Sequence, residues 1–262
     1  MIIQDIDKGK AFDWGKTSSD YAKYRDIYPQ EFYDYILSLG LCKDGQRVLD
    51  LGTGTGVLPR NMYRYGAEWT GTDIAENQIA QAKALAKEAG MNIEFFTCRA
   101  EEVSFPENTF DVITACQCIW YFDHSVTSET FVRMLKSGGR FLILYMGWLP
   151  YEDVVAGKSE KIILKHNPDW TAYGDTVHPV WVPEVYLKNF VLLSQKEFRV
   201  DIPFTRDGWH GRMRACRGVG ASMSPEQLAA WDREHREMLE QNAPEKFMVK
   251  HYVSVAELQV RK

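Results

Sequence analysis

The chain has 262 residues and a formal net charge of −5 at pH 7, with 45% apolar and 26% charged residues. These values are ordinary for a globular protein, and the length suffices for one α/β domain with an added segment. No run of lysine or arginine stands out, which disfavours a nucleic-acid partner. The N-terminus lacks the apolar core of a secretory signal and no apolar stretch approaches about 20 residues, so we expect a cytoplasmic protein without a membrane span.

The five cysteines are an odd number at irregular spacing. Cys116 and Cys118 lie two apart in a run that predicts a strand, so they share one face of it. No second pair of ligands with zinc spacing accompanies them, which favours packed free thiols over a metal or redox site. We therefore expect no metal centre.

Aromatic residues are dense near the N-terminus, over residues 12–25. Ser18 or Ser19 is suited to cap a helix that begins near Asp20. Three tyrosines then fall close to one face of that helix: Tyr21, Tyr24 and Tyr28. Either they pack the helix onto the domain, or the helix covers a ligand. A second helix is predicted over residues 30–39.

The most informative stretch begins with a short apolar run over residues 48–51, which predicts a buried strand. Three glycines follow at alternate positions: Gly52, Gly54 and Gly56. Glycine lets a backbone adopt positive φ and approach a ligand closely, so this loop is expected to wrap around one. Leu58, Met62 and Tyr65 then have helical spacing. A strand, a glycine turn and a helix form the first half of a nucleotide-binding βαβ unit.

The spacing of these glycines narrows the kind of ligand. Dinucleotide-binding loops read G-x-G-x-x-G, because a pyrophosphate sits on the helix N-terminus. Here the spacing is G-x-G-x-G, and Asp50 stands two residues before Gly52. A carboxylate is a poor neighbour for a phosphate but a good one for a cation such as an amino group or a sulfonium.

The stretch VLDLGTGTG, residues 48–56, resembles the first motif of the class I S-adenosylmethionine-dependent methyltransferases. The resemblance implies an α/β fold, with a Rossmann-like, doubly wound sheet of seven strands that is mostly parallel with an antiparallel last strand. It also implies a methyltransferase that uses S-adenosylmethionine as its cofactor. By the same resemblance the loop residues Asp50, Gly52, Thr53, Gly54 and Gly56 bind this cofactor. YAKYRDIYP resembles the N-terminal segment that covers it, which adds Tyr21.

A second strand is predicted over residues 68–72, and it ends at Asp73. An acid at this place can accept hydrogen bonds from both ribose hydroxyls. Asp73, Ile74 and Gln78 resemble the second motif of the family, which implies that they bind the cofactor. As an alternative, Asp73 caps the helix predicted over residues 76–89, although its spacing from the glycines favours the ribose.

The third predicted strand, residues 91–96, is followed by a departure from the family pattern. Relatives often carry an acid before the alanine of this segment, where it accepts from the adenine amino group. Here that position is Arg99, which cannot accept a hydrogen bond. We therefore expect the backbone near Ala100 and Glu101, together with the Glu101 side chain, to hold the adenine.

The fourth predicted strand, residues 112–116, follows SFPENTFD, which resembles the family's loop at this place. It ends near Gln117, at the edge of the sheet where open parallel sheets bind ligands. Gln117 is a candidate for the cofactor, and Trp120 and Tyr121 are candidates for the acceptor substrate. Aromatic faces stabilise a cation by roughly 0.5 to 2 kcal/mol, although each ring could equally pack under a lid.

The fifth predicted strand, residues 141–145, follows MLKSGGR, which resembles the family's turn before strand five. The regular pattern of predicted strands and helices then weakens over residues 146–190, which are rich in tryptophan and tyrosine. This segment is long for a structureless connection and predicts a cap that makes most of the acceptor pocket. Trp170 and His178 are its candidate substrate residues.

The C-terminal part completes the predicted sheet. A sixth strand is expected over residues 197–204, and a last strand over 247–260, with a helix over 225–241 between them. Ser224 is suited to cap that helix, with Pro225 in its first turn. The arginine-rich residues 205–220 either bind an anionic substrate group or form ion pairs with the acidic helix, and we favour the ion pairs.

The expected division of the chain has four parts. Residues 1–40 form a helical segment over the cofactor site, 41–146 the cofactor-binding core, 147–190 the cap insertion after strand five, and 191–262 the rest of the sheet with helices. The resemblance is strong from residue 46 to residue 145 and only architectural afterwards.

Methyl transfer from a sulfonium is a direct displacement, so positioning alone can supply about 7 to 11 kcal/mol. If the acceptor is a hydroxyl or a ring carbon, a base helps, and the candidates are His124, His178 and His210. Alternatively, each of these histidines is structural or solvent-exposed. The expected partner is a small-molecule acceptor, with no nucleic acid, and the chain is expected to be a monomer or homodimer. Two alternatives remain open, a nicotinamide-dependent oxidoreductase and a non-catalytic S-adenosylmethionine-binding protein.

Overall fold

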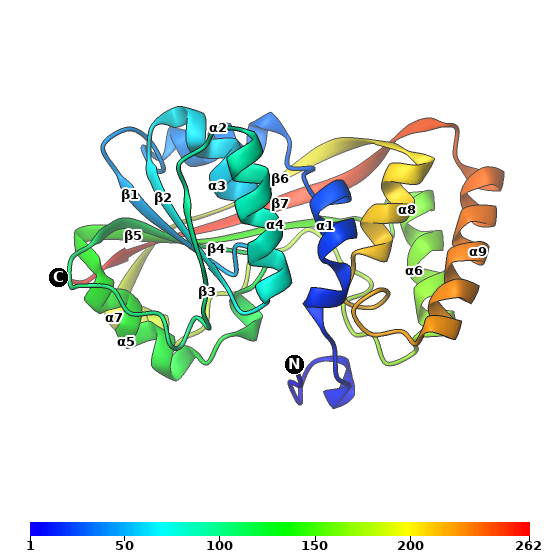
Figure 1. Cartoon of the computed structure of the whole chain (residues 1–262), viewed down its shortest axis with the longest axis horizontal. Coiled ribbons are helices and arrows are strands. Elements are labelled where there is room, and N and C mark those ends of the chain that lie inside the picture. Colours follow the sequence, from blue (N-terminus) through cyan, green and yellow to red (C-terminus); the bar gives the residue numbers. More distant parts are fainter. The chain divides into compact units, whose positions relative to one another are not determined.

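In the computed structural model, all of residues 1–262 are described, and they fall into two compact units. The sheet unit comprises Tyr28–Met146, His178–Phe198 and Val253–Lys262. The helical unit comprises Met1–Ile27, Gly147–Val177 and Arg199–Tyr252. Figure 1 follows the chain from its N-terminus in blue to its C-terminus in red. None of the helices combines the length and the apolar character that crossing a bilayer requires.

The strands form a seven-stranded sheet in the order β3-β2-β1-β4-β5-β7-β6. They are β1 Arg47–Leu51, β2 Glu68–Asp73, β3 Glu94–Thr97, β4 Phe110–Cys116, β5 Leu135–Trp148, β6 Phe190–Thr205 and β7 Lys246–Val260. Six strands are parallel and β7 is antiparallel to them, which confirms the predicted fold class. The chain builds outward from β1 through β2 to β3 and then returns to β4 on the other side of β1. The carboxyl ends of β1 and β4 therefore flank the point where the strand order reverses, which is where such sheets bind ligands.

The central strands are buried on both faces. In β1 only Arg47 is exposed, and in β4 five of seven residues are buried. Parallel strands covered on both faces read as continuous apolar runs, which explains why the sequence predicts them well. The register pairs Val48 with Val112 and Leu51 with Ala115, so the two strands end side by side.

Helices of the sheet unit cover the sheet. They are α2 Gln30–Ser38, α3 Val57–Met62, α4 Glu76–Glu88, α5 His124–Met134 and α7 Tyr186–Asn189, with the 3₁₀ helices η3 Tyr63–Tyr65 and η4 Ile119–Tyr121. Helix α4 packs on β2 and β3, and α5 packs on α7. The carboxylate of Asp123 accepts from the backbone N–H of Ser125 and caps α5. The segment between β4 and α5 follows the carboxyl end of β4.

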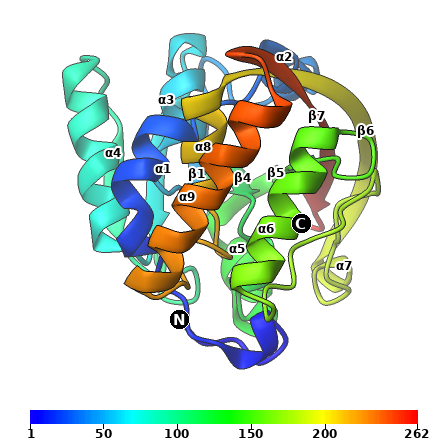
Figure 2. The ribbon, with the colours of Figure 1, turned by 90° about the vertical axis from the view of Figure 1, so that its right-hand side faces the viewer.

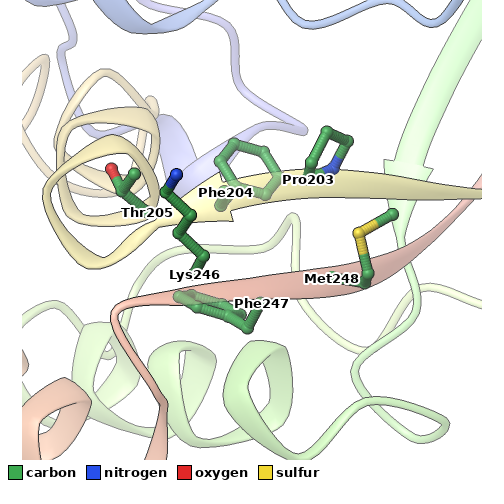
Figure 3. A pocket seen from close by; sticks show the side chains of 6 residues that line it. All are labelled: Pro203, Phe204, Thr205, Lys246, Phe247 and Met248. Atoms are coloured by element: carbon green, nitrogen blue, oxygen red, sulfur yellow. The ribbon is translucent and has the colours of Figure 1, made fainter.

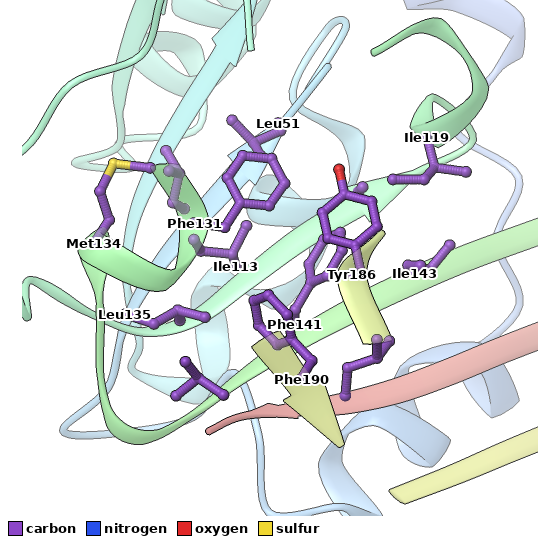
Figure 4. Packing of buried hydrophobic residues seen from close by; sticks show 14 of the residues in the cluster. Leu51, Ile113, Ile119, Phe131, Met134, Leu135, Phe141, Ile143, Tyr186 and Phe190 are labelled. Carbon is purple, nitrogen blue, oxygen red and sulfur yellow. The ribbon is translucent and has the colours of Figure 1, made fainter. Parts of the chain in front are cut away.

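A cluster of aromatic rings forms the core beside β5 (Figure 4). Phe131 of α5, Phe141 of β5 and Tyr186 of α7 are each fully buried. The ring centroid of Phe141 lies 5.2 Å from that of Phe131 and 5.2 Å from that of Tyr186. Aromatic pairs at such distances add about 0.5 to 1.5 kcal/mol beyond the area they bury. This packing fixes α5 and α7 against β5.

The helical unit is built mainly from α1 Ser18–Tyr24, α6 Val154–His166, α8 Arg206–Arg214 and α9 Pro225–Asn242, with the 3₁₀ helices η1 Asp7–Gly9 and η2 Trp14–Thr17. Helix α9 packs on both α6 and α8, and α1 packs on α8, as Figure 2 shows. Trp209 and Trp231 are fully buried in this unit. The unit therefore has an apolar core of its own.

The structure divides the chain differently from the expected four parts. Of the predicted cap over residues 147–190, residues 147–177 belong to the helical unit and residues 178–190 to the sheet unit, and the N-terminal part divides after Ile27. The cause is α6, which buries Val155, Ile162 and Ile163 and needs the sequence-distant α9 to cover them. A helix in that segment was not predicted, because a polar stretch and prolines surround it.

The predicted ion pairing of the arginine-rich segment with the acidic helix is confirmed for Arg214, whereas Arg217 pairs with a residue near the N-terminus. The guanidinium of Arg214 contacts Asp232 of α9 and also Asp20, while that of Arg217 pairs with Asp7. The turn predicted before strand five lies inside β5, where residues 136–139 form a register shift. Strand β6 begins at Phe190, seven residues before the predicted start of the sixth strand.

The predicted serine cap of α9 is confirmed, and it forms part of a capping box: Ser224 Oγ accepts from the backbone N–H of Gln227 at 3.2 Å, and the Ser224 N–H donates to Gln227 Oε1 at 3.0 Å. Replacing Ser224 by alanine should lower the free energy of unfolding by about 0.5 to 2 kcal/mol, since a helix-terminal N–H loses its acceptor. Urea unfolding followed by circular dichroism measures this. Ser224→Asn keeps an acceptor and should retain most of the stability, and equal loss in both variants would contradict the capping role.

Candidate functional site

The loop between β1 and α3 has the backbone that its glycines predict. Gly52, Gly54 and Gly56 have φ of 60°, 56° and 73°, values that side chains strongly disfavour. A Cβ at Gly52 would lie 2.8 Å from the Cys118 sulfur, and one at Gly56 would lie 2.7 Å from the Phe95 ring. The loop thus has no room for side chains at these two positions.

Asp73 holds this loop from the end of β2. Its Oδ2 accepts from the Gly54 N–H at 2.9 Å, and its Oδ1 accepts from the Ala75 N–H at 2.8 Å. Burial raises the pKa of Asp73, and the two backbone hydrogen bonds act in the opposite direction. A carboxylate has about four acceptor sites, so each oxygen keeps capacity for a further donor. Ala75, and not Asp73, is the N-cap residue of α4.

Asp50 lies beneath the loop. Its side chain is 1% exposed, and its Oδ1 accepts from the Thr114 hydroxyl at 2.6 Å. Burial raises the pKa of Asp50 to about 7, against the hydrogen bond of Thr114, while the charge of Asp73 raises it further. This carboxyl acts on the site by its charge and by supporting the loop, because solvent does not reach it.

The other predicted cofactor residues differ in exposure. Ile74 is 42% exposed, whereas Gln78 is buried at 2% and Ala100 at 8%. Glu101 Oε1 accepts from the Asp123 N–H at 2.8 Å, and its Oε2 lies 3.4 Å from Arg99 Nε. Glu101 therefore joins the segment after β3 to the start of α5, and its role toward adenine remains a prediction.

Gln117 marks the carboxyl end of β4. It has a positive φ of 62°, its N–H donates to Leu144 O, and its side-chain Nε2 donates to Met146 O at 2.8 Å. The preceding Cys116 is paired in register with Leu144. The end of β4 and the C-terminal part of β5 are thus joined by both backbone and side-chain hydrogen bonds.

Aromatic side chains gather around Tyr145, in the C-terminal part of β5. The Trp120 ring meets Tyr145 edge to face with centroids 5.6 Å apart, and Tyr121 lies 5.7 Å from Trp120. The imidazole of His178 lies nearly parallel to the Tyr145 ring, at 6.3 Å and 27°. The structure therefore brings together three predicted substrate residues, Trp120, Tyr121 and His178. The sequence interpretation missed Tyr145, although its place as the last residue of the predicted fifth strand could have identified it.

Two other candidates lie in the helical unit. Trp170 is 2% exposed, and a Cβ on Gly218 would lie 2.6 Å from its indole, so this ring packs in a core and has no open face for a substrate. Tyr21 accepts a hydrogen bond from Arg25 Nη2 at 3.2 Å and lies under its guanidinium. Its contact with the cofactor remains a prediction.

The candidate bases differ in their surroundings. His210 is 1% exposed, and its ring nitrogens lie 2.9 Å from His235 Nδ1 and 3.1 Å from Asp232 Oδ1. Burial lowers the pKa of His210 to about 4, so this histidine has a structural role. His124 is half-buried, with its Nδ1 3.4 Å from the Tyr186 hydroxyl, and burial lowers its pKa as well.

An open pocket of about 340 Å³ lies in the helical unit, where β6 ends and β7 begins (Figure 3). Its lining consists of Pro203, Phe204, Thr205, Lys246, Phe247 and Met248. The lining is mainly apolar, and Lys246 is its one charged side chain. It contains none of the predicted site residues, and we assign it no chemistry.

Comparison with known proteins agrees with this geometry. The chain matches the family described as "Methyltransferase domain" over residues 48–139. It is 33% identical over 161 residues to the ubiquinone biosynthesis O-methyltransferase of Pseudomonas fluorescens, over 60% of this chain and 68% of that protein. It is 28% identical over 192 residues to the protein of the same name from Bradyrhizobium diazoefficiens, over 71% and 73%. The solved YcgJ protein of Bacillus subtilis has a similar fold, with a TM-score of 0.52 at 19% identity, over 89% of this chain and 100% of that one.

The raised pKa of Asp50 predicts a pH-dependent stability. Between the unfolded pKa near 3.9 and the folded pKa of about 7, the folded state binds a proton that the unfolded state lacks, so this carboxyl makes stability fall as pH rises. Asp50→Asn should therefore gain stability relative to wild type from about pH 4 to about pH 8, by at most about 4 kcal/mol. Urea unfolding across this range measures the difference.

The difference in stability between wild type and Asp50→Asn reports on Asp50 alone. Buried histidines with lowered pKa, such as His251, have the opposite pH dependence, but they are present in both proteins and cancel. Asp44→Asn, at an exposed position, is the matched control and should show a constant difference from wild type. A constant difference for Asp50→Asn as well would refute the buried, proton-binding carboxyl.

Proposed function

The chain belongs to the class I S-adenosylmethionine-dependent methyltransferases, and from this membership we propose that it moves a methyl group from S-adenosylmethionine to a small-molecule acceptor by in-line displacement. The observation that carries the proposal is the three-glycine loop after β1, with all three glycines at positive φ and the Gly54 N–H held by Asp73. Such a loop suits the close approach of a ligand to backbone.

The residues around the loop fit the adenosyl donor. Asp73 keeps acceptor capacity for two ribose hydroxyls after its two backbone hydrogen bonds. Asp50 supplies negative charge beneath a donor that carries a sulfonium and an amino group. The donor supplies the reactive methyl, and the chain's part is to hold donor and acceptor in line and exclude water.

The acceptor is expected at the carboxyl ends of β4 and β5. Trp120, Tyr145 and His178 gather beside β5, which is the second strand from β1 in the sheet. The similar proteins of Pseudomonas fluorescens and Bradyrhizobium diazoefficiens are named as O-methyltransferases, which supports a hydroxyl oxygen as the acceptor atom. A planar acceptor would suit these rings.

Family membership does not favour the nicotinamide alternative, nor does the G-x-G-x-G spacing of the loop. A non-catalytic protein that only binds the donor has the same loop. Transfer of a radiolabelled methyl group from S-adenosylmethionine separates these cases, because an enzyme must label an acceptor.

Replacing Asp73 by alanine should weaken binding of S-adenosylhomocysteine by about 1.5 to 3 kcal/mol, because hydrogen bonds to a charged group are lost and the Gly54 N–H loses its acceptor. Isothermal titration calorimetry measures this, and the wild type should give no binding heat with NAD. Asp44→Ala, at an exposed carboxylate, is the control and should bind as wild type. Unchanged affinity in the Asp73 variant would remove its assignment to the donor site, and binding of NAD alone would overturn the function.

A further inference from the structure

One row of residues crosses the sheet beneath the glycine loop. The register pairs Asp50 of β1 with Thr114 of β4 on one side and with Gly71 of β2 on the other. Gly71 is in turn paired with Phe95 of β3. Residues in register on neighbouring strands present their side chains to the same face of a sheet. Because its third member is a glycine, the row has a gap between Asp50 and Phe95.

The ring of Phe95 lies in this gap. A Cβ added to Gly71 would be 2.7 Å from Phe95 Cδ1 and 2.8 Å from its Cε1. Carbon atoms in contact are normally about 3.5 to 4.0 Å apart, so a side chain at position 71 would displace the ring. Phe95 is 3% exposed and packs with Ile79 and Ala82 of α4. The ring is therefore held between β2 and α4.

The same ring supports the glycine loop. A Cβ at Gly56 would lie 2.7 Å from Phe95 Cζ, so the third glycine of the loop packs against the far end of the ring. The Gly56 N–H donates to Thr53 O at 2.9 Å, which closes the loop next to this contact. Asp73 holds the loop at Gly54. The loop thus has a polar restraint at its second glycine and an apolar one at its third.

Gly71 has no backbone reason to be a glycine. It lies inside a strand and does not have a positive φ, so its conformation suits any residue. A glycine inside a strand weakens it and often marks the close approach of another group. The nearest atoms to a Cβ at this position belong to the Phe95 ring and to the Thr53 hydroxyl, at 2.9 Å. The space at position 71 therefore serves the loop and the ring beneath it.

We propose that Phe95 is a positioning residue for the methyl donor, and that its ring sets the height of the glycine loop above the sheet. This inference rests on the proposed methyl transfer. The ring acts through Gly56, whose backbone it supports, and needs no contact with the donor. A supported loop has less conformational entropy to lose when a ligand binds. Without the ring, the loop relaxes into the vacated space and binds the donor less well.

A matched pair of core substitutions separates positioning from general stability. Phe95→Val removes the ring under Gly56, and Phe141→Val makes the same change at a buried strand position in the core beside β5. Both should lower the free energy of unfolding measured with urea. Only Phe95→Val should weaken binding of S-adenosylhomocysteine, by about 3- to 30-fold in titration calorimetry, which is the range of coupling between neighbouring groups.

Two further measurements follow the loop itself. Hydrogen exchange of the Gly56 N–H in the unliganded protein should be faster in Phe95→Val and unchanged in Phe141→Val. Phe95→Leu keeps the δ carbons but lacks the Cζ atom that meets Gly56, so it should lose less affinity than Phe95→Val. It takes the place of Phe95→Val if the valine variant does not fold.

A double substitution tests the role of Gly71. Gly71→Ala should displace the ring and weaken binding of S-adenosylhomocysteine in the wild-type protein. The same change should cost less affinity in Phe95→Val, where no ring remains to be displaced. The Thr53 hydroxyl lies close to the new Cβ in both proteins and cancels in this comparison.

Each outcome decides between interpretations. Wild-type affinity in Phe95→Val would overturn the inference. An equal loss in Phe141→Val would do the same, because the effect would then be one of general stability. Additive costs of Gly71→Ala and Phe95→Val would also overturn it, since the ring would not connect the two positions. A wild-type protein that does not bind S-adenosylhomocysteine would reject the proposed function, whereas exchange of the Gly56 N–H would still report whether the ring holds the loop.

Discussion

The hydrogen bond from the Gly54 N–H to the Asp73 carboxylate, at 2.9 Å, is the interaction on which the donor site depends. It joins the loop after β1 to the end of β2, next to the bond from the Thr53 N–H to Thr72 O. Glycines lose more conformational freedom on folding than other residues, so a loop with three of them needs such a restraint. A charged acceptor makes that bond stronger than a neutral one would. The loop therefore has its shape before a ligand arrives.

Asp50 and Asp73 stand at the same edge of the sheet and act differently because of what surrounds them. Asp73 accepts two backbone N–H groups and remains partly accessible, so it can bind hydroxyls directly. Asp50 is sealed beneath the loop with Thr114 as partner, and burial brings its pKa to about 7. A cation placed over the loop favours the ionised form of Asp50. Donor affinity and the charge of this buried carboxyl are thus coupled, although the two need not touch.

The features that the sequence predicted are those decided by neighbouring residues. The strand before Gly52, the acid ending β2 and the Ser224 cap each depend on a few adjacent positions, and all three are present. Helix α6 and the helical unit were missed because their stability comes from contact with the distant α9. Trp170 shows the same limit, since an aromatic residue in an irregular segment suits a pocket or a core equally well. Its burial at 2% exposure and the close approach of Gly218 to its ring, which only the fold shows, assign it to a core.

The histidines show why hydrogen-bond partners do not by themselves make a base. His210 has an apparently stronger arrangement, with His235 on one ring nitrogen and Asp232 on the other. Both nitrogens are thereby engaged inside a core, and burial favours the neutral ring. His178 differs in its surroundings, because its Nδ1 lies 2.7 Å from the carbonyl oxygen of Pro179 and its side chain is exposed. The adjacent His178 and Pro179 are visible in the sequence, but the stacking of His178 on Tyr145 is visible only in the fold.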